Sequence, residues 1–494
     1  MTNLDKLNEE ITANKGSLYY VGGYVRNCLL GIPSKDIDLV VTGINKEKFE
    51  EIANRIFDDI DFVGKSFGVY KTQLRNSPVD LEINVTCNIC NNRFCTCLFR
   101  NNDGSVNENC LCEIDVDISF PRKEFSTGDG HKDFEVVSDE SISLEEDLQR
   151  RDFTINSLVQ NFSTGEIIDL YNGQKDIKLR KIRQITPNSI KEDYLRALRA
   201  IQFASRFNFS IDKETFYNVI ENIDLINTIS AERIRIELEK IITSNNVVQG
   251  FNYLLKSGLL ERILPEIYRL NNEEYNFIYH RYNTYMHTIH MLEEYNKYCH
   301  DRHSLPDLEI CWAILLHDTG KPSVTTKDEF GVYHNYEHEL KSAEISEEVL
   351  RKLKYDNNFI HDVREMVFWH MQTTDKMTKR NIRRLMSKVG YDLACKIYNL
   401  VYYDKLFTSH KMTKEKVKEI TMTINEIKEQ NDALRVIDLK IDGYDVMGFG
   451  IKGKDIGIIL NELLEEVIDD PSKNNREYLL LQLSEKAPQS QPSF

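Results

Sequence analysis

The first third of the chain alternates apolar and polar residues, as β-strands with one buried face do. This alternation is clearest in the stretches DIDLVV, VDLEINVT, EIDVDISF and GEIIDL, and glycine-containing turns separate several of them. A side-chain period of two residues places neighbouring side chains on opposite faces of a sheet. We therefore predict an α+β head domain over residues 1–160.

From about residue 189 the apolar residues recur every three or four positions, which is the spacing of one face of a helix. Glycine becomes rare, and the helical pattern continues to about residue 424. We expect a mostly helical remainder, divided into a neck and body at 161–268, a second helical domain at 269–425 and a C-terminal tail region at 426–494.

Length and charge narrow the class of protein. A chain of 494 residues is too long for one hydrophobic core. It has neither a long apolar run nor a basic-then-apolar start, so we expect a cytoplasmic protein with no membrane partner. The net charge of −16 opposes indiscriminate binding of nucleic acid. Residues 175–206 form a basic island, however, with nine Lys and Arg against three Asp and Glu.

Six of the ten cysteines lie within residues 87–112, and the others are scattered. This distribution is typical of a reducing compartment rather than of a disulfide scaffold. The pairs Cys87/Cys90 and Cys110/Cys112 have spacings that can close a tetrahedral Zn²⁺ site. A lengthened hairpin loop with free thiols explains the same residues, so both interpretations stay open.

Two aspartates on one predicted strand are the first candidate for chemistry. In DIDLVV, Asp36 and Asp38 share a face, and a strand half in water explains an isolated pair of this kind. Here Gly22 and Gly23 follow an apolar strand, so backbone N–H groups beside a helix N-terminus are accessible to phosphate oxygens. Arg26 adds positive charge one turn later. Paired carboxylates hold Mg²⁺ together with substrate phosphates, so the pattern indicates metal-assisted phosphoryl chemistry.

The segment GGYVRNCLLGIPSKDIDLVV resembles the G-G-x-V-R-D…D-x-D signature of the class II tRNA nucleotidyltransferases. These are the CCA-adding enzymes, with the related bacterial poly(A) polymerases, in the polymerase-β-like nucleotidyltransferase superfamily. Asn27 stands where the family usually has Asp. The block RRDFTIN is similar to the family's R-R-D-F-T-x-N. This resemblance implies that Arg151, Asp152 and Asn156 contact the triphosphate and ribose.

The segment EDYLRALRAIQFASRF resembles the family's E-D-x-x-R-x-x-R motif. The resemblance implies that Asp193 and Arg196 select C or A, with Arg199 nearby in support. Three residues apart on a helix, Asp193 and Arg196 would lie on one face, where a surface ion pair is the alternative interpretation. A carboxylate accepts from an exocyclic amine while a guanidinium donates to the ring, so the pair can select a base without a template.

A third carboxylate is expected on a neighbouring strand. The family's E-I-D-V block before Pro-Arg, followed by a T-G-x-G-H loop, favours Asp115. Asp80, Glu82 and Asp117 remain alternatives. With Asp115 as the third carboxylate, residues 76–112 form a cysteine-rich insertion in the head.

A histidine-rich pattern follows in YMHTIH, LLHDTGKP, HNYEHELKSAE, FWHM and YYDK. It resembles the HD domain fused to many bacterial CCA-adding enzymes. The resemblance implies a divalent metal on His287, His317, Asp318 and Asp404. His338 and His370 would serve a second metal or a phosphate. Imidazole and carboxylate ligands suit Mn²⁺, Ni²⁺ or Fe²⁺, and we expect a 2′,3′-cyclic phosphodiesterase or phosphatase. The alternative is an HD fold kept as a structural spacer.

Taken together, the motifs predict template-independent addition or repair of the 3′-terminal CCA of tRNA. The expected partners are the tRNA 3′ end, CTP and ATP, with Mg²⁺ in the head and no obligatory protein partner. Enzymes that add only CC or only A, and a poly(A) polymerase, are alternatives of the same class. An HD phosphohydrolase with an RNA-binding head and a non-catalytic RNA-binding protein are alternatives of other classes.

Overall fold

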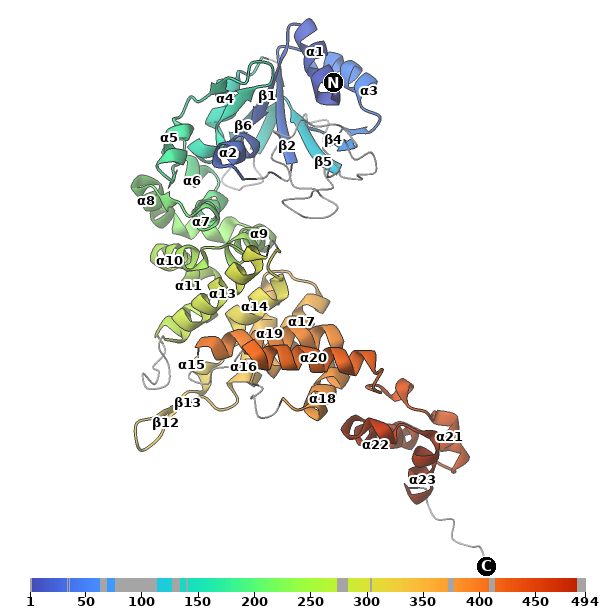
Figure 1. The fold of residues 1–494 in the computed structure, drawn as a ribbon. Coiled ribbons are helices and arrows are strands. Elements are labelled where there is room, and N and C mark those ends of the chain that lie inside the picture. Colours follow the sequence, from blue (N-terminus) through green and yellow to red (C-terminus); the bar gives the residue numbers. More distant parts are fainter. Residues whose placement is uncertain are drawn as a thin grey trace, which may run out of the picture. The chain divides into compact units, whose positions relative to one another are not determined.

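The structure is a computed structural model, and it falls into two compact units (Figure 1). The N-terminal unit comprises Met1–Ile263 with Asn296–Pro306, and the C-terminal unit comprises Leu264–Tyr295 with Asp307–Phe494. The described residues are 2–32, 34, 36–62, 69–75, 113–126, 134–138, 141–272, 283–302, 304–371, 377–407 and 414–486.

A seven-stranded sheet organises the first part of the N-terminal unit, in the order β3-β4-β5-β2-β1-β8-β9. Strands β1 and β2 are antiparallel, whereas β2 and β5 are parallel. The strands are β1 (Ser17–Val21), β2 (Asp36–Thr42), β3 (Ile60–Asp61), β4 (Val69–Arg75), β5 (Glu113–Ser119), β8 (Val159–Asn161) and β9 (Ile167–Ile168). Strands β6 (Arg122–Ser126) and β7 (Phe134–Ser138) form a separate hairpin.

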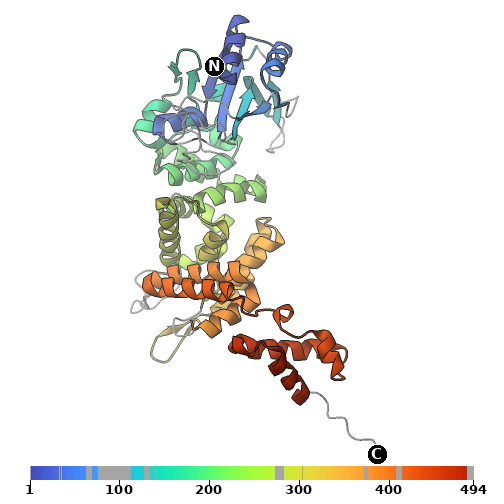
Figure 2. The ribbon, with the colours of Figure 1, turned by 45° about the vertical axis from the view of Figure 1, so that its right-hand side comes forward.

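Helices α1 (Asn3–Ala13) and α3 (Lys46–Ile56) lie against one face of this sheet (Figures 1 and 2). Ile37 and Leu39 of β2 are fully buried in the resulting core, as alternation predicts. On the opposite face, Val40 packs in an apolar cluster with Leu148 of α4 (Leu144–Gln149). That cluster covers one end of the face and leaves the aspartate end of β2 for polar chemistry.

Apart from a short parallel pair, β10 (Lys181–Ile182) and β11 (Ser210–Ile211), helices make up most of the rest of the N-terminal unit. This confirms the predicted change from an α+β head to a helical body. Helix α7 packs against α9 and α10. The helices are α2 (Gly23–Leu30), α5 (Gly173–Lys178), α6 (Ser189–Glu192), α7 (Leu195–Phe207), α8 (Lys213–Glu221), α9 (Ala231–Ile242), α10 (Val247–Ser257) and α11 (Leu259–Ile263).

The C-terminal unit is also mainly helical. Its apolar helix α14 is buried almost along its whole length, with Trp312 at 0% exposure. Helix α13 (Thr284–Asp301) begins in this unit, and its residues from Asn296 onward belong to the N-terminal unit. The other helices are α12 (Pro265–Arg269), α14 (Leu308–Leu316), α15 (Lys321–Val324), α16 (His338–Lys352), α17 (Asn357–Trp369), α18 (Lys379–Val389), α19 (Tyr391–Phe407), α20 (Lys414–Glu429), α21 (Gly443–Gly448), α22 (Lys454–Asp469) and α23 (Arg476–Lys486).

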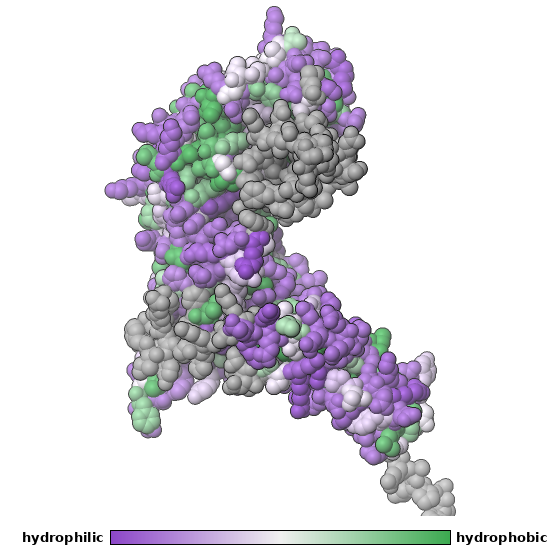
Figure 3. Space-filling model, viewed as in Figure 1, coloured by the Kyte–Doolittle hydropathy of each residue, from purple (hydrophilic) through white to green (hydrophobic). Residues whose placement is uncertain are grey.

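Two smaller features complete this unit. Strands β12 (Thr326–Lys327) and β13 (Tyr333–His334) form a hairpin between α15 and α16. Residues after 432 have an apolar cluster of their own, centred on Leu463, Val467 and Leu479. The surface in Figure 3 is largely hydrophilic. Within the described ranges, no helix combines the length and apolar character required to cross a bilayer.

Candidate functional site

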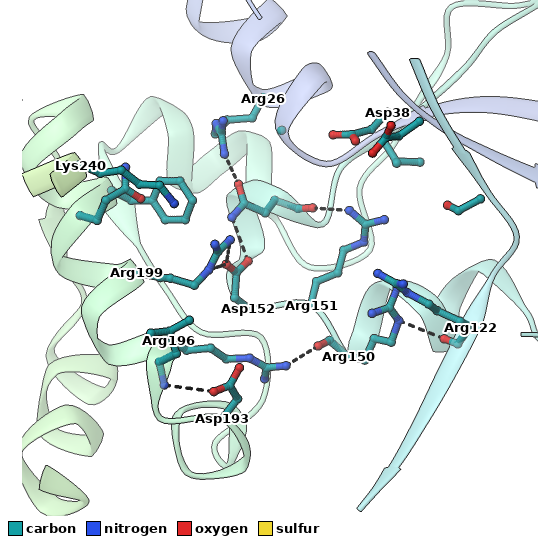
Figure 4. Close-up of a pocket in the computed structure, with 18 of the residues that line it drawn as sticks. Arg26, Asp38, Arg122, Arg150, Arg151, Asp152, Asp193, Arg196, Arg199 and Lys240 are labelled. Atoms are coloured by element: carbon teal, nitrogen blue, oxygen red, sulfur yellow. Dashed lines mark hydrogen bonds and ion pairs between the residues drawn. The ribbon is translucent and has the colours of Figure 1, made fainter. Parts of the chain in front are cut away.

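A cavity of about 700 Å³ in the N-terminal unit gathers most of the predicted head residues (Figure 4). Nine cationic side chains line it, against four carboxylates. The cations are Arg26, Arg122, Arg150, Arg151, Arg196, Arg199, Arg206, Arg233 and Lys240, and the carboxylates are Asp38, Asp117, Asp152 and Asp193. A cavity with this excess of positive charge attracts a polyanion such as a nucleoside triphosphate.

The aspartates of β2 lie beside those of β5. Asp36 is directly opposite Asp115, and Asp38 is opposite Asp117, so four carboxylates share one face of the sheet. Burial, and then the negative charge of Asp36, raise the pKa of Asp38 to about 6. Both effects disfavour the ionised carboxylate. A divalent cation between the strands would offset this repulsion, and carboxylate oxygens are the ligands that Mg²⁺ prefers.

The third carboxylate has two candidates in this register. Asp117 lines the cavity with Asp38 and forms an ion pair with Lys71 at 3.0 Å. Asp115 is exposed and accepts a hydrogen bond from Gln73 Nε2 at 3.0 Å. The assignment to Asp115 therefore stays a prediction, and the geometry favours Asp117. Asp80 and Glu82 lie outside the described residues.

Gly22 allows an arginine to approach the backbone between β1 and α2. Its φ is +62°, and a Cβ atom there would lie 2.5 Å from Nη1 of Arg151. Only glycine meets both conditions without strain. Arg151 also donates to Asp147 Oδ2 at 3.2 Å, and Asp147 is buried. The glycine turn and Asp147 thus hold Arg151 at the cavity wall.

Arg26 is buried at the start of α2, and its guanidinium donates to the amide oxygens of Asn27 and Asn156. Burial and the charge of Arg206 lower the pKa of Arg26 to about 9, which still leaves it charged at neutral pH. Asn27 also donates to Ser34 at 2.8 Å. Because Asn27 is neutral where the family usually has Asp, the charge of Arg26 is left available to an anionic ligand.

The RRDFTIN block surrounds a buried carboxylate. Asp152 accepts from Arg199 at 2.7 Å, from Asn156 Nδ2 at 2.8 Å and from the backbone N–H of Phe153 at 2.8 Å. Burial alone would raise its pKa, but Arg199 and these hydrogen bonds hold the pKa of Asp152 below its usual value. Asp152 therefore fixes Arg199 and Asn156 at the cavity.

Asp193 and Arg196 both line the cavity. Contrary to the prediction, they do not lie on one helix face. Asp193 has extended backbone angles between α6 and α7, and its Oδ1 accepts from the N–H of Leu195 at 3.1 Å. An aspartate that bonds its own backbone in this way competes with helix continuation. Arg196 donates to Ser189 Oγ at 2.7 Å and to the carbonyl of Arg150 at 2.7 Å.

Helix α9 supplies cavity residues that sequence reasoning missed. Arg233 donates to Asp193 Oδ2 at 3.0 Å, so both oxygens of Asp193 are engaged. Lys240 pairs with buried Glu237 at 2.8 Å. Arg206 and Phe203 of α7 also line the cavity. Arg206 and Phe203 follow Arg196 and Arg199 at helical spacing, so the sequence could have indicated that they lie on the same side of α7. No sequence pattern links the residues of α9 to the cavity.

The C-terminal unit brings all six predicted histidine and aspartate ligands together, but as two triads. Asp318 lies between the triads, 3.2 Å from both His317 Nε2 and His338 Nε2, so the set of His287, His317, Asp318 and Asp404 stays a prediction. The first triad is His287, His317 and Asp404, and the second is Asp318, His338 and His370. All six residues are buried, and the donor atoms of each triad lie within 4.8 Å of one another. We call these six residues the HD centre.

The histidines of the second triad are arranged as metal ligands are. Nδ1 of His338 is 2.8 Å from the carbonyl of Asn335, and Nδ1 of His370 is 2.5 Å from that of Val367. When Nδ1–H donates to a carbonyl, Nε2 carries the lone pair. The two Nε2 atoms are only 3.2 Å apart, so their lone pairs face each other. A cation bound by these two nitrogens and by Asp318 would accept both lone pairs and so relieve their repulsion. Two imidazoles and a carboxylate are a donor set that fits a transition metal.

Burial lowers the pKa of His370 to about 3, so the ring stays neutral as a ligand must. Two lysines flank the carboxylates of the centre. Lys321 pairs with Asp318 and Lys405 with Asp404, at 2.7 Å and 2.8 Å.

The proposed zinc ligands Cys87, Cys90, Cys110 and Cys112 lie outside the described residues.

Comparisons with known proteins cover most of the chain. The family patterns "Poly A polymerase head domain", "Probable RNA and SrmB- binding site of polymerase A" and "tRNA nucleotidyltransferase domain 2 putative" match residues 18–183, 208–270 and 336–483. The chain is 30% identical to the "Multifunctional CCA protein" of Methylobacillus flagellatus over 69% of its length and 70% of that protein. It is 31% identical to the protein of the same description from an Azoarcus species, over 68% and 69%.

Solved structures share the fold. The CCA-adding enzyme of Bacillus stearothermophilus in complex with CTP superposes with a TM-score of 0.65 at 19% identity, covering 98% of this chain and 97% of that one. The Thermotoga maritima CCA-adding enzyme complexed with tRNA superposes with a TM-score of 0.54 at 20% identity, covering 98% and 94%.

Proposed function

This chain belongs to the bacterial family of CCA-adding tRNA nucleotidyltransferases, and on that premise we propose that it builds or repairs the 3′-terminal CCA of tRNA from CTP and ATP. The observation that carries the proposal is the cationic cavity, with Asp38 of β2 and Asp117 of β5 at its wall. Positive charge would hold the triphosphate, and the carboxylates would hold the catalytic metal beside it.

In the proposed reaction, the terminal hydroxyl of the RNA attacks the α-phosphate of the nucleotide and pyrophosphate leaves. Bound Mg²⁺ would activate the hydroxyl and offset charge on the leaving group. Asp36, Asp38 and one carboxylate of β5 are the residues that would hold it. Arg26 and Arg151 neutralise the phosphate oxygens and fix the triphosphate for in-line attack. Such positioning supplies most of the catalysis in phosphoryl transfer.

The test uses tRNA ending without CCA, without CA and without A, each incubated with one labelled nucleotide at a time. We expect incorporation of C on the first and second substrates and of A on the third. Incorporation on none of the three would overturn the proposal. Indefinite addition of A would identify a poly(A) polymerase, and addition confined to C or to A would identify a partial enzyme.

Nucleotide choice is assigned to Asp193 and Arg196, which line the same cavity as Asp38 and Asp117. Arg196→Ala should lower the preference for CTP over UTP, and for ATP over GTP, by at least about tenfold in kcat/KM. The reason is that the hydrogen bonds from the Arg196 guanidinium to the base edge discriminate between bases, and the alanine variant cannot make them. The measurement is single-nucleotide incorporation with each of the four triphosphates.

Lys240→Ala is the matched control, because it removes positive charge from the same cavity at a residue of α9. It should raise the KM for all four triphosphates without changing the preference among them. Unchanged preference in Arg196→Ala would contradict the assignment.

Gly22→Ala tests the approach of Arg151 to the backbone. We expect about 100-fold lower kcat/KM for nucleotide addition, because the new methyl group displaces a guanidinium that positions phosphate. Gly31→Ala is the control, since Gly31 has a φ of +65° but nothing within 4 Å of an added Cβ. Gly31 has left-handed backbone, so Gly31→Ala should lose about 1 kcal/mol of stability, whereas Gly22→Ala should lose more, because the ψ of −122° at Gly22 lies in a region still less accessible to an L residue. Equal activity of the two would show that the Arg151 contact is unimportant.

A second function is proposed for the HD centre: metal-dependent hydrolysis of phosphate esters, including 2′,3′-cyclic phosphodiesters. The specific observation in its favour is the pair of buried triads with Asp318 within 3.2 Å of both His317 Nε2 and His338 Nε2. Asp318 is thus placed to bridge two metals. Mn²⁺, Ni²⁺ or Fe²⁺ would suit the ligands and would supply an activated water for attack on phosphorus.

A further inference from the structure

Arg26 is a buried cation whose hydrogen-bond partners are neutral. It is 5% exposed, and its guanidinium donates to the amide oxygens of Asn27 and Asn156. Within the ranges that the structure describes, no carboxylate forms an ion pair with this guanidinium. A buried charge is costly unless nearby groups compensate it, and amide oxygens provide only part of that compensation. The other neighbours of Arg26 must therefore provide the rest.

Two phenylalanines of α7 lie against this guanidinium. The Cζ atom of Arg26 is 4.8 Å from the ring centroid of Phe207 and 5.2 Å from that of Phe203. The two rings are four residues apart on the helix, and they are nearly parallel, with centroids 5.7 Å apart and planes 8° apart. The face of an aromatic ring attracts a guanidinium, most strongly where water is excluded. These rings therefore stabilise the buried charge of Arg26.

The same two rings contact two more arginines of the cavity. The Cζ atom of Arg199 is 5.3 Å from the centroid of Phe203, and that of Arg206 is 5.3 Å from the centroid of Phe207. All three arginines line the cationic cavity, where Figure 4 shows Arg26 and Arg199. Their charges repel one another: after burial, the charge of Arg206 is the main cause that lowers the pKa of Arg26. The two rings thus stabilise a cluster of like charges.

We infer that Phe203 and Phe207 are positioning residues for nucleotide addition, because their rings hold the three arginines together as the group that binds the triphosphate. Cations that are already close together before the triphosphate arrives bind it more tightly than cations that must first be gathered. A ring has no net charge, so it does not compete with phosphate for the guanidinium of Arg26 as a carboxylate would. This inference rests on the proposed nucleotide addition and identifies what arranges its phosphate-binding side chains.

Phe207→Leu removes the ring that contacts both Arg26 and Arg206 but keeps an apolar side chain. With Mg²⁺ present, the Kd of the full chain for CTP, ATP and inorganic tripolyphosphate should rise about tenfold, and by the same factor for each, because the arginines bind phosphate and not the base. Phe207→Tyr keeps the ring and should bind as wild type. Phe209→Leu is the matched control, since the buried ring of Phe209 is 5.9 Å from that of Phe207 and no guanidinium of the described residues lies over it. This control should leave all three Kd values unchanged.

Fluorinated phenylalanines separate the electrostatic effect of the ring from its packing. Mono-, di- and trifluorinated phenylalanine at position 207 weaken the negative face of the ring in steps with little change of shape, so the affinity for tripolyphosphate should fall in the same order. The same series at position 209 should leave that affinity unchanged. Equal affinity throughout the series at position 207 would overturn the inference, as would wild-type protein that binds no tripolyphosphate. Wild-type protein that binds tripolyphosphate but adds no nucleotide to tRNA would instead refute the proposed function, and the fluorinated series would still decide the inference.

Discussion

Asp38→Asn is expected to lower nucleotide addition by at least about 10³-fold without unfolding the head. The substitution keeps the shape of the side chain but removes one negative charge from the set of aspartates on β2 and β5 that would hold the metal. A metal held by these residues activates the attacking hydroxyl and stabilises the leaving pyrophosphate, and such charge stabilisation amounts to several kcal/mol. The measurement is the single-turnover rate of CMP addition to tRNA lacking CCA.

Thermal melting separates this effect from misfolding. The folded-state pKa of Asp38 is raised to about 6, mainly by burial and then by Asp36, so the folded state binds the proton more tightly than the unfolded state. Stability contributed by this group is therefore lost as pH rises through 6. At pH 8, the Asp38→Asn variant, whose side chain is neutral, should melt at the same temperature as wild type or higher. Wild type should be stabilised by Mg²⁺ with CTP, and the variant should not. A lower melting temperature in the metal-free variant would contradict this account.

The same assay identifies the third carboxylate. Asp117→Asn should approach the loss seen in Asp38→Asn, whereas Asp115→Asn should retain most of the activity, because Asp117 lies at the cavity and Asp115 is exposed. The reverse result would restore Asp115 as the ligand. The two residues share a strand and a face, so each serves as the other's control.

These two aspartates show what the sequence could predict about the site. Alternation acts within a single strand. It predicts that Asp36 and Asp38 share a face of one strand and that Asp115 and Asp117 share a face of another. The choice between Asp115 and Asp117 depends on how β5 is aligned with β2, and those strands are far apart in the sequence. That register is fixed by tertiary packing, which alternation does not encode.

Helix α7 shows a related limit. Helical spacing correctly predicted the segment, but Asp193 lies outside it because its carboxylate bonds to the N–H of Leu195. The partner that engages its other oxygen, Arg233, comes from α9, 40 residues further on. In the HD centre, the motifs named six residues that lie together, but not that Asp318 lies between His317 and His338. Family motifs name residues, whereas grouping them requires the distances between helices.

The second large effect is expected at the HD centre, where His317→Ala combined with Asp318→Ala should abolish phosphodiester hydrolysis and leave nucleotide addition intact. His317 belongs to one triad and Asp318 to the other, so the double variant removes a ligand from each. Loss of the activated water should cost at least about 10³-fold in rate. Addition of CMP by the same preparation reports on folding, and loss of both activities together would contradict separate sites.

Metal content tests the division into two triads more directly than the rate does. Elemental analysis of wild type loaded with Mn²⁺ or Ni²⁺ should give two ions per chain at the HD centre, and His370→Ala should give one, since it removes a ligand from the second triad alone. His361→Ala, at an exposed histidine of the same helix α17, should keep both. One ion in wild type would refute the two-metal centre. Because His370 is neutral and its Nε2 faces that of His338 at 3.2 Å, a second ion is the arrangement that satisfies both lone pairs at once.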